Sequence, residues 1–96
     1  MARFDAYANP GASAQNTPYL LDVQNDLFNG LDTRMVIPLR TLAPFAQMKR
    51  PDRLMPLFHL AGERFLLETP KMAAVPASIL KQPVATLASE HHTVPY

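Results

Sequence analysis

The chain has 96 residues, nine basic and eight acidic side chains, and a formal net charge of +1 at pH 7. That length allows one domain, and so small a basic excess argues against nucleic acid as the main ligand, because proteins that hold phosphates are usually clearly basic. A domain of this size has a thin stability margin, and without cysteines it cannot add disulfides, so we expect a homodimer. The lack of cysteine also fits the reducing cytoplasm. No apolar stretch approaches the roughly 20 residues of a membrane helix, so we expect no membrane partner.

The first predicted strand covers residues 3–8. Polar and apolar residues alternate along it with the period of two that is typical of a half-buried strand, with Tyr7 on the polar face and an apolar face made by Phe4, Ala6 and Ala8. Residues 9–18 lack any apolar period and contain two prolines, so we expect an exposed and mobile loop there.

The next two apolar runs predict a hairpin with a long tip. Residues 19–24 and 34–39 are rich in large and branched apolar side chains, whereas residues 25–33 contain Asn, Asp and Gly, which favour turns. Pro38 cannot donate a hydrogen bond to a neighbouring strand. The second strand should therefore end at Pro38 or lie with it at a sheet edge.

A second, tighter hairpin is predicted after an irregular stretch over residues 40–56. It pairs residues 57–60 with residues 64–68, and Gly62 supplies the positive φ that a tight turn favours. Alternation along the first strand of this hairpin places His59 on the solvent side.

The last third of the chain predicts short elements only. Residues 72–75 fit either one helical turn or a short strand, residues 80–87 read as a loop leading to a short apolar stretch, and residues 88–96 have no helical stripe. Short strands, ten prolines and no long amphipathic segment predict a small, mostly antiparallel β barrel or sheet over residues 1–87, followed by a short tail.

The groups that could carry chemistry are few. We interpret the aspartates Asp22, Asp26 and Asp32 as turn-forming and solubilising residues, since their spacing fits no calcium loop. His91 and His92 are adjacent, so in an extended chain they point to opposite faces and do not suit one metal ion. With no cysteine nucleophile, no nucleophilic serine motif and no glycine-rich phosphate loop, the sequence predicts no enzyme, no metal and no cofactor.

Two surface candidates remain. The apolar pair Leu27 and Phe28 interrupts a polar connector, which suits either a protein interface or a fold-back into the core or a dimer seam. Lys49, Arg50 and Arg53 form the densest basic cluster, which is either a solvated loop or a docking patch for an acidic partner.

Five segments of the chain follow one another in a characteristic order: Leu21-Asp22-Val23-Gln24-Asn25-Asp26, Thr33-Arg34-Met35-Val36-Ile37-Pro38-Leu39, Leu54-Met55-Pro56-Leu57-Phe58-His59-Leu60, the stretch from Met72 to Leu80, and Pro83-Val84-Ala85-Thr86-Leu87. In wording and order they resemble the CcdB family of plasmid-addiction toxins. The resemblance implies the fold that this family shares with MazF, a small SH3-like antiparallel barrel, and it implies that residues 72–75 are extended.

The resemblance also implies a function. CcdB proteins are toxin components of type II toxin–antitoxin systems; they bind the A subunit of DNA gyrase as homodimers, without catalysis, and a CcdA-type antitoxin neutralises them. On that basis the gyrase-facing residues are Leu27, Phe28 and Asn29, and the dimer interface contains Met72, Ala73, Ala74 and Val75. We assign antitoxin binding to the basic cluster Lys49, Arg50 and Arg53.

One feature departs from the family pattern. CcdB proteins carry a helix after the segment that matches residues 83–87, whereas Thr93, Val94 and Pro95 oppose a helix here. We therefore expect the C-terminal helix to be missing or rudimentary, and gyrase poisoning to be weakened or lost. The alternatives are a MazF-like endoribonuclease toxin and a non-toxic dimer that binds the antitoxin.

Overall fold

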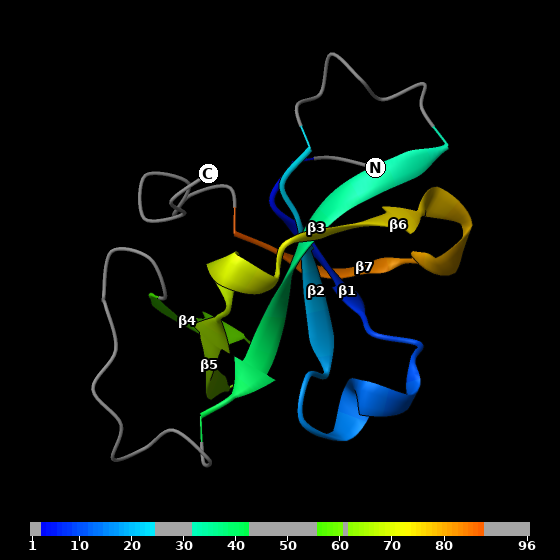
Figure 1. Ribbon diagram of the computed structural model, residues 1–96. Coiled ribbons are helices and arrows are strands. Elements are labelled where there is room, and N and C mark those ends of the chain that lie inside the picture. Colours follow the sequence, from blue (N-terminus) through cyan, green and yellow to red (C-terminus); the bar gives the residue numbers. More distant parts are fainter. Residues whose placement is uncertain (1–2, 25–31, 43–55, 61, 88–96) are drawn as a thin grey trace.

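The computed structural model describes residues 3–24, 32–42, 56–60 and 62–87 (Figure 1). These residues form strands β1 Asp5–Ala8, β2 Tyr19–Asp22, β3 Thr33–Thr41, β4 Leu57–Leu60, β5 Glu63–Leu67, β6 Ala73–Pro76 and β7 Pro83–Thr86. Three short 3-10 turns, η1 Ala12–Gln15, η4 Thr69–Lys71 and η5 Ala77–Ile79, connect them. No α-helix occurs within the described ranges, so this part of the protein is mostly β, as predicted.

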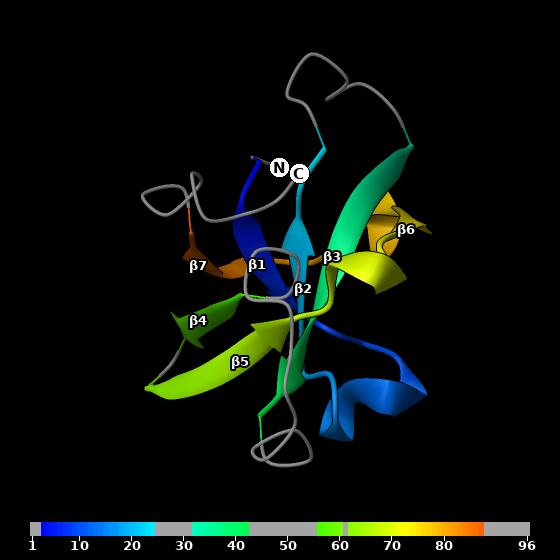
Figure 2. The ribbon, with the colours of Figure 1, turned by 60° about the vertical axis from the view of Figure 1, so that its left-hand side comes forward.

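The strands form one antiparallel sheet in the order β4-β5-β3-β2-β1-β7. The long strand β3 is its centre: one edge pairs with β2, while the other edge pairs first with β6 over residues 33–36 and then with β5 over residues 39–41. The sheet curls strongly, so that β4 and β5 turn across its face (Figure 2). This half-barrel confirms the predicted SH3-like barrel architecture.

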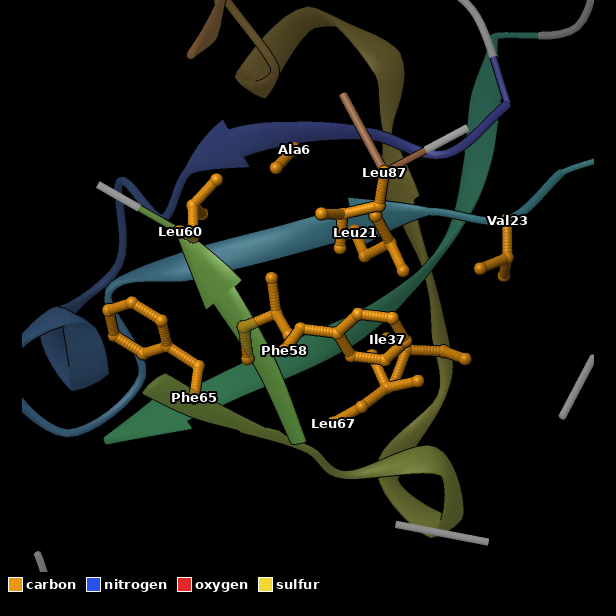
Figure 3. Close-up of a cluster of buried hydrophobic side chains, with 10 residues drawn as sticks. Ala6, Leu21, Val23, Ile37, Phe58, Leu60, Phe65, Leu67 and Leu87 are labelled. Atoms are coloured by element: carbon orange, nitrogen blue, oxygen red, sulfur yellow. The ribbon is translucent and has the colours of Figure 1, made fainter. Parts of the chain in front are cut away.

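The main hydrophobic core lies inside the curl. It collects alternate residues of the strands and the side chain of Leu87 (Figure 3): Ala6, Leu21, Val23, Ile37, Leu39, Phe58, Leu60, Phe65, Leu67 and Leu87. The ring of Tyr19 stands edge-on to Phe65, with centroids 5.2 Å apart. A fully buried side chain of this size contributes about 1.5–3 kcal/mol, so this cluster is the main source of stability.

The opposite face of the sheet is also partly buried, which the sequence did not predict. Tyr7 is only 1% exposed and packs in a second cluster with Leu20, Val36 and Leu80, whereas Ala8 is exposed. The assignment of Tyr7 to the polar face and Ala8 to the apolar face was therefore wrong. The cause is tertiary: residues 77–80 return over this face and cover it.

Pro38 lies inside β3, not at its end or at a sheet edge, so that prediction was wrong. The N–H of Glu68 donates to the Pro38 carbonyl at 3.0 Å. Because the nitrogen and carbonyl of a strand residue point to the same edge, the Pro38 nitrogen points away from β2, towards the position where β3 changes partner from β6 to β5. The lack of an N–H at Pro38 therefore costs β3 no hydrogen bond to β2.

Both predicted hairpins are present. Strand β2 pairs with β3, and β4 pairs with β5 through a turn in which Gly62 has a φ of 81°. His59 is exposed opposite buried Phe58, and the ambiguous segment around residues 72–75 is extended in β6.

Two regions differ from expectation. Residues 83–86, predicted as a loop and a short apolar stretch, form β7 and pair with β1. The loop after β1 contains η1 and several backbone hydrogen bonds, including one of 2.8 Å from the Thr41 N–H to the Asn16 carbonyl. The predicted hairpin tip, the irregular stretch over residues 43–55 and the tail at 88–96 lie outside the described residues.

Candidate functional site

A buried ion pair joins β2 to β3. Arg34 Nε donates to Asp22 Oδ2 at 2.7 Å, and Arg34 Nη2 lies 2.7 Å from the same oxygen. The two side chains are 1% and 0% exposed. The prediction that Asp22 serves turn formation and solubility was therefore wrong; the hairpin register, which pairs Asp22 with Val36, was the signal that could have shown Arg34 nearby.

Burial is the main influence on the pKa values of Asp22 and of nearby Tyr7. Loss of solvent raises the pKa of Asp22, although a hydrogen bond from the Gln24 N–H and the guanidinium of Arg34 both oppose that rise. Burial likewise raises the pKa of Tyr7, assisted by the negative charges of Asp5 and Asp22. The pair thus lies in a low-dielectric environment where a lost partner is costly.

Gln24 closes the end of the β2–β3 ladder. Its N–H donates to Asp22 Oδ1 at 3.0 Å, and its side-chain Oε1 accepts the N–H of Met35 at 3.0 Å. The Val23 N–H donates to the Met35 carbonyl at 2.9 Å. The Gln24 side chain therefore binds Met35 beyond Asp22 and Val36, the last paired residues of β2 and β3. The two strands thus stay joined up to residue 24, just before the predicted connector begins.

A groove of about 750 Å³ opens on the same face of the sheet. One wall is the loop between β1 and β2; the floor is β2 and β3; the other wall runs from the end of β5 through η5. Its lining combines apolar side chains with a few polar ones, the usual composition of a binding site: Asn9, Pro10, Gly11, Asn16, Thr17, Leu20, Pro38, Arg40, Glu68, Lys71, Val75 and Ile79.

Glu68 is the buried charge of this groove. Its side chain is 8% exposed and lies between two cations, with Oε1 3.9 Å from Arg40 Nη1 and Oε2 3.5 Å from Lys71 Nζ. Both distances exceed those of good hydrogen bonds, and Oε1 accepts no hydrogen bond. Arg40 and Lys71 are 25% and 59% exposed, so a ligand entering the groove meets the cations before the carboxylate.

The loop wall is held by its own side chains. Asn9 Nδ2 donates to the Thr17 carbonyl at 2.8 Å, and Asn9 Oδ1 accepts the Gly11 N–H at 2.9 Å. A Cβ at Gly11 would lie 3.2 Å from that same oxygen, which is a tight contact. The wall is therefore held by contacts within the loop itself.

The predicted dimer-interface residues lie in and beside β6. Met72 is partly buried against the main core, and Val75 packs against the second cluster, while Ala73 and Ala74 are exposed. The structure thus separates these four residues into two that pack inward and two that face outward, and Val75 also lines the groove.

The remaining predicted site residues are not among those described. The gyrase-facing residues Leu27, Phe28 and Asn29, the basic cluster Lys49, Arg50 and Arg53, and the pair His91 and His92 all lie outside the described ranges. Sequence reasoning missed the groove residues Arg40, Glu68 and Lys71. No local motif marks them, because the groove forms only where three separate segments meet.

Comparison with known protein families matches residues 3–95 to the family of the CcdB protein. The chain belongs to the CcdB family. The match confirms the resemblance drawn from the five sequence blocks, and it extends into the stretch predicted as a tail. As a CcdB protein, the chain is a toxin component of a toxin–antitoxin system.

Two further findings concern the described residues of this CcdB protein. They bring together no group of three His, Asp or Glu side chains that could hold a metal ion. They also contain no helix with the length and apolarity needed to cross a membrane.

Proposed function

We propose that this CcdB protein acts in the cytoplasm by binding the A subunit of DNA gyrase as a homodimer, without catalysing a reaction, and that a CcdA-type antitoxin neutralises it. The observation that carries the proposal is the family match over residues 3–95. The buried Asp22–Arg34 pair and the Gln24 bonds support it, because they join the strands that flank residues 25–31. The proposed gyrase-facing residues Leu27 and Phe28 belong to that connector.

Expression in cells without antitoxin tests the gyrase target. We expect growth arrest with accumulation of cleaved DNA, relieved by substitutions in the gyrase A subunit. Killing that no gyrase substitution relieves would contradict the proposed target. The same assay tests the expectation, drawn from Thr93, Val94 and Pro95, that poisoning is weakened: full potency would overturn it.

Direct binding tests the proposed contact residues. We expect Phe28→Asp to abolish binding of the purified protein to the gyrase A subunit in calorimetry, because a charge replaces an apolar anchor. Val84→Asp is the matched control, since Val84 is an apolar side chain that is 53% exposed on β7. Equal loss with both variants would contradict a specific role for Phe28.

The second candidate is a MazF-like endoribonuclease, the enzyme that the sequence leaves open as an alternative. RNA cleavage requires an acid–base pair beside basic side chains, and the groove offers one carboxylate, Glu68, beside Arg40 and Lys71. Incubation with single-stranded RNA is the test. Sequence-specific cuts that disappear in Glu68→Gln would replace the gyrase proposal with this one, and intact RNA would exclude it.

A further inference from the structure

We infer that the groove between the β1–β2 loop and residues 68–79 binds an extended acidic peptide that carries an aliphatic side chain. We assign this peptide to the antitoxin, and that assignment rests on the proposed function. The site differs from the basic cluster Lys49, Arg50 and Arg53, to which the sequence assigns the antitoxin.

The floor of the groove suits an aliphatic side chain. Leu20 and Pro38 lie side by side on adjacent strands, as paired residues of β2 and β3. Val75 and Ile79 line the same groove from the opposite wall and are only partly buried. An aliphatic side chain placed among these four residues removes apolar surface from water on both partners, which favours binding.

The charges select an acidic ligand. Lys71 is 59% exposed and Arg40 is 25% exposed, whereas the carboxylate between them is 8% exposed. An entering carboxylate therefore reaches two cations at the rim of the groove before it approaches Glu68. Lys71 Nζ, 3.5 Å from Glu68 Oε2, is in a weak Coulombic pair, so the attraction of this lysine for a second carboxylate is retained.

The buried carboxylate argues for a peptide and against nucleic acid. A polyanionic backbone laid along the floor would bring phosphates close to Glu68, whose Oε1 is buried and accepts no hydrogen bond. A peptide can instead place a backbone or side-chain N–H at that oxygen, which satisfies it. The apolar floor has no use for a sugar–phosphate chain, and the net charge of the protein is only +1.

The walls of the groove are held by contacts within the protein, which lowers the free-energy cost of binding. The hydrogen bonds of Asn9 to Thr17 and Gly11 hold one wall in place, and the pairing of β6 with β3 supports the other. A preformed groove spends little free energy on ordering itself when the ligand enters.

The test uses a short fluorescent peptide in which Asp and Glu alternate with Leu and Val, together with a neutral peptide that has Asn and Gln in place of the acids. Titrated with the full chain in fluorescence anisotropy, the acidic peptide should bind and the neutral one should bind about tenfold more weakly, with the difference shrinking as salt is added. Equal binding of both peptides, or no binding of either, would overturn the inference.

The site itself is tested by charge reversal. Lys71→Glu should weaken binding of the acidic peptide by about tenfold. Lys81→Glu makes the same change at an exposed lysine outside the groove lining and should alter affinity less than twofold, because solvent and salt screen a charge that does not contact the ligand. Circular dichroism of both variants checks that each is folded, and Ile79→Asp should give an independent loss of binding through the apolar side of the wall.

The outcomes separate this inference from the proposed function. Peptide binding unaffected by Lys71→Glu and Ile79→Asp sinks the groove assignment, whatever the gyrase assays show. Single-stranded RNA that displaces the acidic peptide from the groove also overturns it. Conversely, binding of the acidic peptide here with no binding of a CcdA-type antitoxin refutes the antitoxin assignment and with it that part of the proposed function.

Discussion

Two buried carboxylates on one face of the sheet behave differently. Asp22 and Arg34 are both enclosed and are joined at 2.7 Å, with Gln24 satisfying the second carboxylate oxygen. Glu68 is also buried, but its partners Arg40 and Lys71 stand 3.9 and 3.5 Å away and reach solvent. The arginines of both groups come from β3. We call Asp22 with Arg34 the closed pair, and Glu68 with Arg40 and Lys71 the open group.

The difference separates structural from binding chemistry. A closed pair has already lost its hydration, so its value lies in fixing the register of β2 against β3, and removing one partner leaves an uncompensated charge. The open group keeps its cations at the rim of a groove, where they can attract a ligand. Burial of the carboxylate alone would not have distinguished the two.

The largest expected effect is loss of the closed pair. Arg34→Met leaves the Asp22 charge buried without its cation and should lower the free energy of unfolding by about 3–5 kcal/mol, measured by urea denaturation. The double variant with Asp22→Leu should recover most of that loss. A single variant as stable as the wild type would show that the pair is not enclosed.

A second prediction concerns pH. Because burial raises the folded-state pKa of Asp22 above its unfolded value, the folded protein holds this proton more tightly than the unfolded chain. The stabilising contribution is therefore complete below about pH 4 and is lost as pH rises through the raised pKa. Asp22→Asn should remove this contribution to the change of the free energy of unfolding with pH. If the free energies of unfolding of the wild type and the variant change with pH in the same way, the prediction is contradicted.

The open group should tolerate change. Glu68→Gln should alter the free energy of unfolding by no more than about 1 kcal/mol, and it should raise affinity for the acidic peptide about threefold because a repelling carboxylate is gone. Urea denaturation and anisotropy measure the two effects. A destabilisation equal to that of Arg34→Met would place Glu68 with the closed pair.

The smallest expected effect is at the rim. Lys71→Ala should change the free energy of unfolding by less than about 0.5 kcal/mol, since its side chain is 59% exposed and its ion pair among the described residues is the i,i+3 contact with Glu68. Lys81→Ala is the matched control in thermal unfolding. A clear stability loss at Lys71 alone would mean that the rim group is structural.

Much of the fold could be predicted because it depends on local pattern. Alternation and turn residues locate both hairpins, including the turn at Gly62 and exposed His59, and the resemblance to CcdB proteins identifies β6 as extended. The interior position of Pro38 could not be predicted, because it is tolerated only where β3 changes partner between two distant strands.

The candidate site was less predictable than the fold. Asp22 reads as a turn residue in sequence, yet the hairpin register brings Arg34 to it and tertiary packing excludes water from both. Tyr7 reads as a polar-face residue, yet the return of residues 77–80 buries it. In each case a residue distant in sequence supplies the neighbour that determines its environment.

Order along the chain was sufficient to establish the family, the strand periodicity and the two hairpins, since these depend on neighbouring residues and short turns. Only folding in three dimensions created the closed pair and the groove. Arg40, Glu68 and the wall around Asn9 come from three segments with no shared motif, and it is the curl of the sheet and the partner exchange of β3 that bring them together.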